Sequence, residues 1–219
     1  MGCLKLGVLF SGRGTNLQAI LDACQDSSFP AEIALAISNK PDAPGLVRAQ
    51  KANVPSSVIN HKDFADRPSF EQAMNARLDE AGVELICLAG FMRLLTPTFV
   101  NHWNGRAINI HPSLLPAYPG LNTHARAIND GARFAGCTVH FLSAEMDAGP
   151  IIAQAATPIS ASDTPDSLAA RVLEAEYEIY QRAIRWVAEG RITLHEGRVM
   201  IDGAGDDASF YLPTVNSAV

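Results

Sequence analysis

The chain has 219 residues, of which 47% are apolar and 18% are charged, so it is long enough to bury one large hydrophobic core. Its net charge of -6 and its pI near 5.5 argue against a broad surface for nucleic acid or anionic membranes and favour small-molecule partners. No apolar run reaches the ~18 residues of a membrane span, and the N-terminus lacks the layout of a signal peptide. We therefore expect a cytoplasmic protein that begins near Met1.

The cysteines are widely scattered and contain no C-x-x-C pair; they are Cys3, Cys24, Cys87 and Cys137. Three of them lie in apolar runs, where a reduced cysteine behaves as a small hydrophobic residue. The sequence therefore predicts reduced thiols and no disulfide.

A glycine-rich loop, called here the glycine loop, separates the first predicted strand, residues 5–10, from a helix whose apolar positions span 17–24. It reads Ser11-Gly12-Arg13-Gly14-Thr15-Asn16. Backbone N–H groups and the positive end of the helix dipole meet at such a turn, which favours phosphate binding. The alternative is a tight turn in which Thr15 or Asn16 only caps the helix. The loop matches neither G-x-G-x-x-G, because Leu17 takes the third glycine position, nor the G-K-[ST] of a P-loop.

The second predicted strand, residues 32–38, ends in Ser38-Asn39-Lys40 without an acidic residue. A carboxylate at this point would hold the ribose of NAD, so its absence argues against a dehydrogenase. A short helix at 46–52, a strand at 56–60 and a longer helix at 68–81, which Gly82 ends, follow in order.

A nearly continuous apolar run at 83–89 is typical of a central parallel strand that is covered on both faces. The apolar loop, residues 90–95, follows this strand, and Thr96 and Pro97 are expected to begin the next helix as cap and first residue. Such a loop would either line a pocket for a flat ring or simply close the core.

Two polar side chains end the next apolar strand, which runs to His111. Asn109 and His111 are two positions apart, so on an extended segment they point to the same face. Prolines at 112, 116 and 119 then favour a stiff loop. The pair would display an amide and an imidazole together; the alternative is an Asx turn and a histidine half buried against the sheet. A helix is predicted at 123–129.

The pattern changes after Gly131, because two strand-like runs at 137–143 and 150–159 are joined by the short loop 144–149. Asp147 in this loop is either an ordinary turn residue or part of a site. The longest helix is predicted from Pro165 to about residue 189, and a hairpin at 192–195 and 199–201 follows it.

Alternating strands and helices predict an α/β fold, a doubly wound, mostly parallel, Rossmann-like sheet with a mixed C-terminal part. We expect residues 1–202 to form a single domain and residues 203–219 to form a loosely ordered tail. Ligands of such sheets bind outside the carboxyl ends of the strands, where the glycine loop, the apolar loop and Asn109 with His111 are expected.

Four motifs occur in a fixed order along the chain. They are Ser11-Gly12-Arg13-Gly14-Thr15-Asn16-Leu17-Gln18, Ala89-Gly90-Phe91-Met92-Arg93-Leu94-Leu95, Ile108-Asn109-Ile110-His111-Pro112-Ser113-Leu114-Leu115-Pro116 with Tyr118-Pro119-Gly120, and Asp147-x-Gly149-Pro150. Together they resemble the phosphoribosylglycinamide formyltransferases, folate-dependent enzymes of purine biosynthesis, over about residues 5–200. The resemblance implies a Rossmann-like formyltransferase fold and transfer of the formyl group of 10-formyltetrahydrofolate, as co-substrate, to the amine of glycinamide ribonucleotide. It also implies a monomer or homodimer without a metal, and no binding of nucleic acid or membrane.

The resemblance further implies the residues of the site. The catalytic group would be Asn109, His111 and Asp147. The ribonucleotide site would comprise Gly14, Thr15, Asn16, Leu173, Glu174, Ala175 and Glu176. The folate site would comprise Arg67, Met92, Arg93, Leu94, Leu95, Asn109, Ser143, Ala144, Glu145, Met146 and Asp147.

The chemistry of formyl transfer suits the three catalytic residues. The amine attacks the formyl carbon, the oxygen of the tetrahedral intermediate becomes negative, and the nitrogen must lose a proton. Asn109 and a protonated His111 can donate hydrogen bonds to that oxygen, while Asp147 can favour the imidazolium and relay the proton. No metal is needed, and His111, His124 and His140 lack tight ligand spacing.

Two residues depart from the family pattern. Arg13 replaces a small polar residue, and Ala148 stands where glycine is usual, which would constrain the loop because alanine resists positive φ angles. Formyltetrahydrofolate hydrolase uses a similar Asn, His and Asp set but usually adds an N-terminal regulatory domain. Methionyl-tRNA formyltransferase adds a tRNA-binding domain, and an inactive nucleotide-binding module would explain only the glycine loop.

Overall fold

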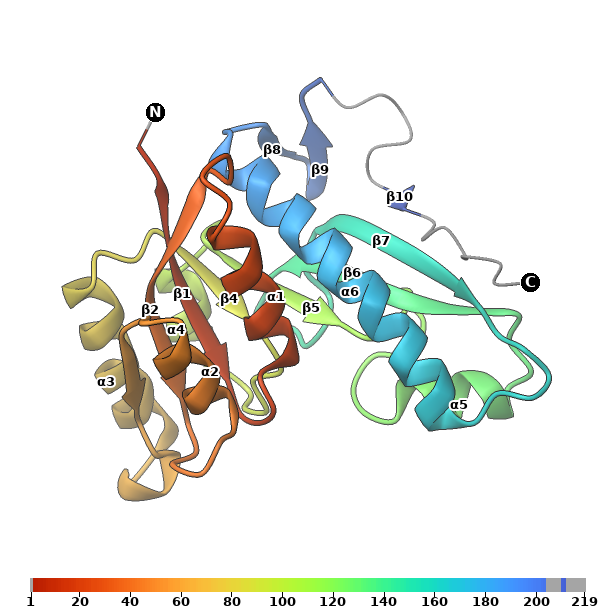
Figure 1. Cartoon of the computed structure of the whole chain (residues 1–219), viewed down its shortest axis with the longest axis horizontal. Helices are drawn as coiled ribbons and strands as arrows, with labels where there is room; N and C mark the ends of the chain where they lie inside the picture. Colours follow the sequence, from red (N-terminus) through yellow and green to blue (C-terminus); the bar gives the residue numbers. More distant parts are fainter. Residues whose placement is uncertain (1, 204–209, 212–219) are drawn as a thin grey trace.

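A single large sheet, with helices on both faces, organises the computed structural model, which describes residues 2–203, 210 and 211 (Figure 1). The strands of this sheet are β1 (Leu4–Phe10), β2 (Ala31–Ser38), β3 (Ser56–Val58), β4 (Leu85–Leu88), β5 (Ala107–His111), β6 (Phe134–Phe141), β7 (Ile151–Pro158) and β10 (Phe210–Tyr211). The helices are α1 (Thr15–Cys24), α2 (Gly45–Lys51), α3 (Arg67–Glu80), α4 (Pro97–His102), α5 (Thr123–Asn129) and α6 (Pro165–Ala188). A hairpin of β8 (Ile192–His195) and β9 (Arg198–Ile201) follows α6.

The strand order is β10-β7-β6-β5-β4-β1-β2-β3. The strands from β3 through β5 are parallel, whereas β6 is antiparallel to both β5 and β7. The predicted α/β fold with a mostly parallel sheet and a mixed C-terminal part is therefore confirmed.

Alternation along β1 divides the core into two hydrophobic clusters, one on each face of the sheet. Leu6, Val8 and Phe10 pack into the cluster that contains α1 and α6, whereas Leu9 packs into the cluster that contains α3 and α4. The helix α6 lies across the sheet in Figure 1. Its buried Tyr180 hydroxyl lies 2.9 Å from the carbonyl oxygen of Leu88 and 3.3 Å from that of Ile108, which ties α6 to the ends of β4 and β5.

Several boundaries differ from the sequence-based expectation. The strand β6 begins at Phe134, three residues before the predicted start at residue 137. The continuous apolar run used for the prediction begins only after Gly136, so it did not include the first residues of the strand. The predicted strand at 56–60 ends at Val58. Asn60 then caps a short 3-10 helix, His61–Asp63, by accepting a hydrogen bond from the backbone N–H of Lys62 at 3.2 Å.

The expected loose tail lies mostly outside the described residues, and within it Phe210–Tyr211 pair in parallel with β7. All four cysteines are free thiols, as predicted. Among the described residues, no helix is both long enough and apolar enough to span a membrane.

Candidate active site

The glycine loop is shaped by close packing rather than by a side-chain cap. Gly14 has a left-handed backbone with a φ of 67°, and a Cβ there would lie 2.7 Å from the Cα of Gly45. The helix α1 begins without any capping hydrogen bond from a side chain, so the alternative in which Thr15 or Asn16 only caps this helix is wrong. The N–H groups of its first turn are therefore available to an anion.

Asn16 pairs with a carboxylate from the other end of the sequence. Its Nδ2 donates to Oε2 of Glu176 on α6 at 2.7 Å, and both residues are buried. Burial raises the pKa of Glu176 to about 7, and the hydrogen bond from Asn16 opposes this shift. Of the other predicted residues on α6, Ala175 lies in the core and Glu174 is exposed.

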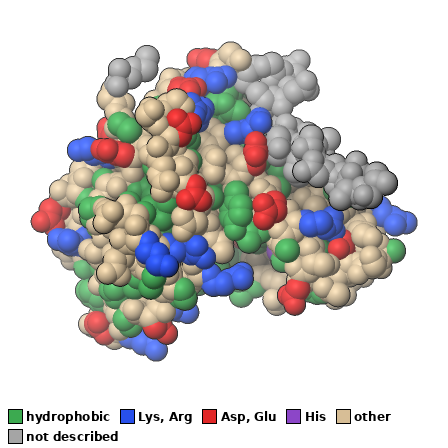
Figure 2. Space-filling model, in the orientation of Figure 1, with side chains coloured by type: hydrophobic (Ala, Val, Ile, Leu, Met, Phe, Trp, Pro, Cys, Tyr) green, Lys and Arg blue, Asp and Glu red, His purple; other side chains and the backbone are tan. Residues whose placement is uncertain are grey.

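Arg48 and Tyr177 lie beside the glycine loop, although no sequence pattern predicted them there. Arg48 on α2 donates from Nε to the carbonyl oxygen of Arg13 at 2.9 Å, and Arg48 and Tyr177 both line a cavity of about 210 Å³. The lining residues of this cavity are Thr15, Gln18, Ala19, Asp22, Arg48, Tyr177 and Gln181. Figure 2 shows Lys and Arg side chains over the region of α1 and α2, although the chain as a whole is acidic.

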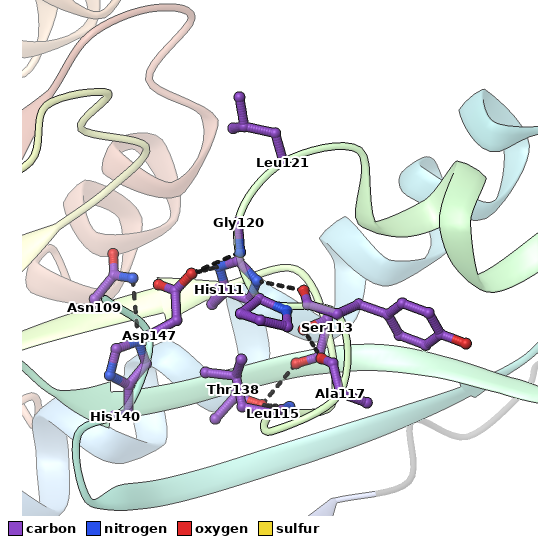
Figure 3. A network of polar contacts seen from close by, with 12 residues as sticks. Asn109, His111, Ser113, Leu115, Ala117, Gly120, Leu121, Thr138, His140 and Asp147 are labelled. Atoms are coloured by element: carbon purple, nitrogen blue, oxygen red, sulfur yellow. Dashed lines mark hydrogen bonds and ion pairs between the residues drawn. The ribbon is translucent and has the colours of Figure 1, made fainter. Parts of the chain in front are cut away.

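Asn109 faces His140 on the neighbouring antiparallel strand. Their side chains meet with 3.2 Å between Nδ2 of Asn109 and Nε2 of His140 (Figure 3). Nδ1 of His140 lies 2.9 Å from the carbonyl oxygen of Phe141. Burial lowers the pKa of His140, so the ring is neutral at pH ~7. With the proton on Nδ1, the ring donates a hydrogen bond to the carbonyl oxygen of Phe141, and Nε2 accepts one from the Asn109 amide.

His111 has both ring nitrogens engaged. Nε2 lies 3.1 Å from the carbonyl oxygen of Tyr118, and Nδ1 lies 3.6 Å from Oδ2 of Asp147. The same Oδ2 accepts a hydrogen bond from the backbone N–H of Gly120 at 2.8 Å (Figure 3). The structure thus brings Asn109, His111 and Asp147 to one side of the sheet, although Asn109 and His111 lie on β5 and Asp147 lies on the loop between β6 and β7.

The proline-containing loop after His111 is fastened to β6. The hydroxyl of Thr138 donates to the carbonyl oxygen of Ser113 at 2.7 Å and accepts from the N–H of Leu115 at 3.1 Å. Ser113 in turn donates to the carbonyl oxygen of Ala117 at 2.7 Å (Figure 3). These bonds fix the segment whose Tyr118 carbonyl orients the ring of His111.

The loop that carries Asp147 depends on a tight backbone approach. A Cβ on Gly149 would lie 1.7 Å from the carbonyl oxygen of Phe141, so only glycine fits there. The left-handed residue of this loop is Asp147, with a φ of 54°, and Ala148 does not have a positive φ. Ala148 thus avoids the positive φ that alanine resists, and the unusual backbone of this loop lies one residue earlier; that Ala148 constrains the loop stays a prediction.

Two of the loops predicted for the folate site carry exposed apolar side chains. Met92 and Leu94 of the apolar loop and Met146 of the Asp147 loop are exposed, at 63%, 57% and 55%. Leu121, 74% exposed, is a further apolar side chain that sequence reasoning missed. Among the other predicted residues, the buried Nε of Arg93 has no hydrogen-bond partner among the described residues, and Leu95 packs against the core. Ala144, Glu145 and Arg67, which begins α3, are exposed, and Ser143 is partly buried.

No group of His, Cys, Asp and Glu side chains in the described part of the chain is arranged to hold a metal ion. The charged and polar groups of the site are instead an amide, an imidazole and a carboxylate, which suit proton transfer and the stabilisation of a developing negative oxygen.

Comparison with known proteins places these features in context. Residues 4–184 match the family model described as formyl transferase. A phosphoribosylglycinamide formyltransferase from Haemophilus influenzae is 46% identical over 207 residues, which cover 94% of this chain and 98% of that protein.

Solved structures agree with the sequence comparison. A phosphoribosylglycinamide formyltransferase from Coxiella burnetii has a TM-score of 0.89 and 46% identity, and the match covers 95% of this chain and 98% of that one. A formyltetrahydrofolate deformylase from Pseudomonas putida has a TM-score of 0.82 but only 30% identity, and the match covers 90% of this chain and 70% of the deformylase.

Proposed function

This chain belongs to the formyl transferase family, and on that premise we propose that it transfers the formyl group of 10-formyltetrahydrofolate to the amine of glycinamide ribonucleotide. The products are formylglycinamide ribonucleotide and tetrahydrofolate, and the reaction is a step of purine biosynthesis. The observation that carries the proposal is the meeting of Asn109, His111 and Asp147 in a chain that matches such an enzyme over nearly its whole length.

Asn109 and His111 are the donors that we assign to the oxygen of the tetrahedral intermediate. One N–H of the Asn109 amide is used by His140, and the second N–H remains for the formyl oxygen. Nε2 of His111 is directed at Tyr118, so Nδ1 is the ring atom that donates toward the reacting groups.

Asp147 completes a closed cycle of proton transfers. When the amine attacks the formyl carbon, the new C–N bond forms and the carboxylate accepts the proton that the nitrogen must lose. When the bond from carbon to N10 of the folate breaks, the leaving nitrogen takes a proton from Nδ1 of His111. Transfer of the proton from Asp147 to Nδ1 across the 3.6 Å pair restores both residues.

The glycine loop and Glu176 are the groups that we assign to the ribonucleotide. The uncapped start of α1 suits the phosphate, and the buried Asn16–Glu176 pair lies beside it. The exposed apolar side chains of Met92, Leu94 and Met146 suit the flat rings of the folate.

The experiment that tests the proposal compares two acceptors for the formyl group. The purified protein is given 10-formyltetrahydrofolate with and without glycinamide ribonucleotide, and both tetrahydrofolate and formylated ribonucleotide are quantified. We expect equimolar formation of the two products and negligible release of tetrahydrofolate without the amine. The alternative is a formyltetrahydrofolate hydrolase, as in the 30% identical deformylase, and equal release of tetrahydrofolate with water alone would establish it instead.

A further inference from the structure

A single serine hydroxyl lies between the glycine loop and the apolar loop. Ser11 directly follows β1, whose Leu9 is in register with Leu88 of the parallel neighbour β4. The backbone N–H of Ser11 donates to the carbonyl oxygen of Gly90 at 3.1 Å, and its Oγ accepts from the N–H of Met92 at 2.7 Å. The start of the apolar loop is therefore attached to the residue that begins the glycine loop.

The direction of these hydrogen bonds is fixed by the chemistry of the groups. A backbone N–H can only donate, so the Ser11 oxygen accepts from Met92 and its one proton goes to Oδ1 of Asn39, 2.6 Å away. This orients the Asn39 amide, whose Nδ2 lies 3.2 Å from Nδ1 of His61. Ser11 is 3% exposed and Asn39 is 1% exposed, so bulk water has little access to replace a missing hydroxyl.

The apolar loop is also held just past its other end. The buried carboxylate of Glu71 on α3 accepts from the backbone N–H of Thr96 at 2.8 Å and from the Thr96 hydroxyl. Between the two attachments, the side chains of Met92 and Leu94 remain exposed. The backbone of the apolar loop is therefore ordered before any ligand arrives, while its apolar side chains are free to contact one.

The glycine loop has anchors that do not involve the Ser11 hydroxyl. The N–H of Gly45 donates to the carbonyl oxygen of Gly12 at 3.1 Å, and Nε of Arg48 donates to that of Arg13 at 2.9 Å. Loss of the Ser11 hydroxyl would thus free the backbone N–H of Met92 in the apolar loop and leave the glycine loop in place.

We propose that Ser11 is a positioning residue for the folate subsite, although in sequence it belongs to the loop assigned to the ribonucleotide. The inference rests on the proposed function and names a residue that touches neither substrate. The hydroxyl holds the N–H of Met92, so the apolar loop keeps the shape that receives the folate. Without it, Met92 and Asn39 lose their buried partner and the loop gains other conformations that bind folate poorly.

Ser11→Ala tests this, with Ser38→Ala as the matched control. Ser38 is also a buried serine at the carboxyl end of a neighbouring strand, but within the described part of the chain its hydroxyl bonds to the backbone of Lys40 alone, at 2.8 and 3.1 Å. For Ser11→Ala, we expect both the Kd for tetrahydrofolate and the KM for the formylated folate to rise about tenfold, while the KM for the ribonucleotide changes by less than about twofold. Ser38→Ala should leave all three within about twofold of the parent.

Hydrogen exchange gives a readout that does not depend on activity. The amide of Met92 should exchange about tenfold faster in Ser11→Ala than in the parent, and at the parent rate in Ser38→Ala. Arg48→Met provides the crossed comparison, because it should raise the KM for the ribonucleotide and leave the Kd for tetrahydrofolate unchanged. If Ser11→Ala does not fold, Ser11→Cys, whose slightly larger thiol fills the place of the hydroxyl but accepts hydrogen bonds weakly, should shift the same quantities in the same direction.

Two results would overturn the inference. The first is an unchanged Kd for tetrahydrofolate in Ser11→Ala. The second is an equal rise in the KM for the formylated folate and the KM for the ribonucleotide, seen in both Ser11→Ala and Ser38→Ala, which would indicate a general loss of structure. Failure of the proposed function is a separate result. A parent protein that binds tetrahydrofolate but formylates no ribonucleotide would refute the activity, while the Kd and exchange comparisons would still decide the role of Ser11.

Discussion

At the scale of single residues, the orientation of the Asn109 amide depends on the protonation of its neighbour. His140 is buried and neutral, and its Nδ1–H donates to the carbonyl oxygen of Phe141, so Nε2 can only accept. The amide nitrogen of Asn109 must then face His140, and the second amide hydrogen is left for a ligand. A buried neutral histidine therefore selects one of the two orientations that an asparagine side chain could adopt.

Asn109→Ala tests the assigned role of this amide in the transition state. One donor to a developing oxyanion contributes about 10²- to 10³-fold in kcat, so we expect a loss of that size with smaller changes in both KM values. Steady-state kinetics measures it, and the melting temperature checks that the fold is intact. A loss below about threefold would leave Asn109 with only a structural role, as the partner of His140.

Glu176 makes the stability of the ligand-free protein depend on pH. Burial raises its pKa to about 7, so the folded state retains a proton that the unfolded state releases near pH ~4.3. Because the folded pKa is the higher one, the contribution of Glu176 to stability is fully present below pH ~4.3 and is lost as the pH rises through about 7.

Glu176→Gln should remove this dependence, since the new amide oxygen can still accept from Asn16. We expect the variant to melt higher than the parent by a margin that grows from pH ~5 to pH ~7 and is constant above that range. Calorimetry at several pH values measures the margin, and Glu174→Gln, an exposed change on the same helix, is the control. A margin that does not vary with pH would refute the assignment.

At the scale of elements, the proline-containing loop after β5 is anchored to β6 by one threonine. The Thr138 hydroxyl serves both Ser113 and Leu115, and Nε2 of Gln154 on β7 also lies 3.0 Å from it. The prolines stiffen the loop, and this hydroxyl, together with the bond from Gln154 to the carbonyl oxygen of Leu115, attaches the loop to the sheet.

Thr138→Val should destabilise the protein by about 1–3 kcal/mol, because buried partners lose their hydrogen bond while the shape is kept. It should also lower kcat, since the Tyr118 carbonyl that orients His111 lies in the same loop. Thr157→Val is the control, because that hydroxyl on β7 is buried and has no hydrogen-bond partner among the described residues. Chemical denaturation compares the two variants; equal losses of stability would contradict the anchoring role.

The sequence predicts individual helices and strands better than it predicts which segments lie beside them in the fold. Strand ends and helix starts were read correctly where local chemistry marks them, as at Thr96, whose hydroxyl accepts from the N–H of Phe99 at 3.3 Å. Asn109 and His111 were found because their spacing places them on one face. The roles of His140, Ser11 and the Tyr118 carbonyl were not foreseen, because each depends on a strand or loop that the sequence alone does not place beside it. Asp147 was assigned through family resemblance, since nothing local distinguishes it from a turn aspartate.

At the scale of the whole molecule, burial sorts the four thiols by reactivity. Cys3 is exposed and Cys24 half-buried, whereas Cys87 and Cys137 are enclosed in the core. Burial raises the pKa of Cys24 to about 12 and raises the pKa of Cys87 and Cys137 as well, so few of these thiols are ionised near neutrality.

A thiol-specific disulfide reagent at pH ~8 should therefore label Cys3 rapidly and the two core cysteines only as fast as the protein opens globally. Mass spectrometry of timed samples identifies the labelled positions, and Cys3→Ser should remove the rapid phase. Rapid labelling of Cys87 or Cys137 in the native protein would show that the core opens locally.

The position of α6 after the strands β1 to β7 in chain order has a consequence for how the protein is made. Glu176 pairs with Asn16 over a separation of 160 residues, and Tyr180 reaches back to β4 and β5 over separations of 92 and 72 residues. A chain emerging from the ribosome has therefore presented Asn109, His111 and Asp147 before the helix that covers one face of the sheet exists. Until α6 docks, that apolar face is open to chaperones and the glycine loop lacks its carboxylate. The proposed ribonucleotide site is thus completed only after α6 has been synthesised and has docked.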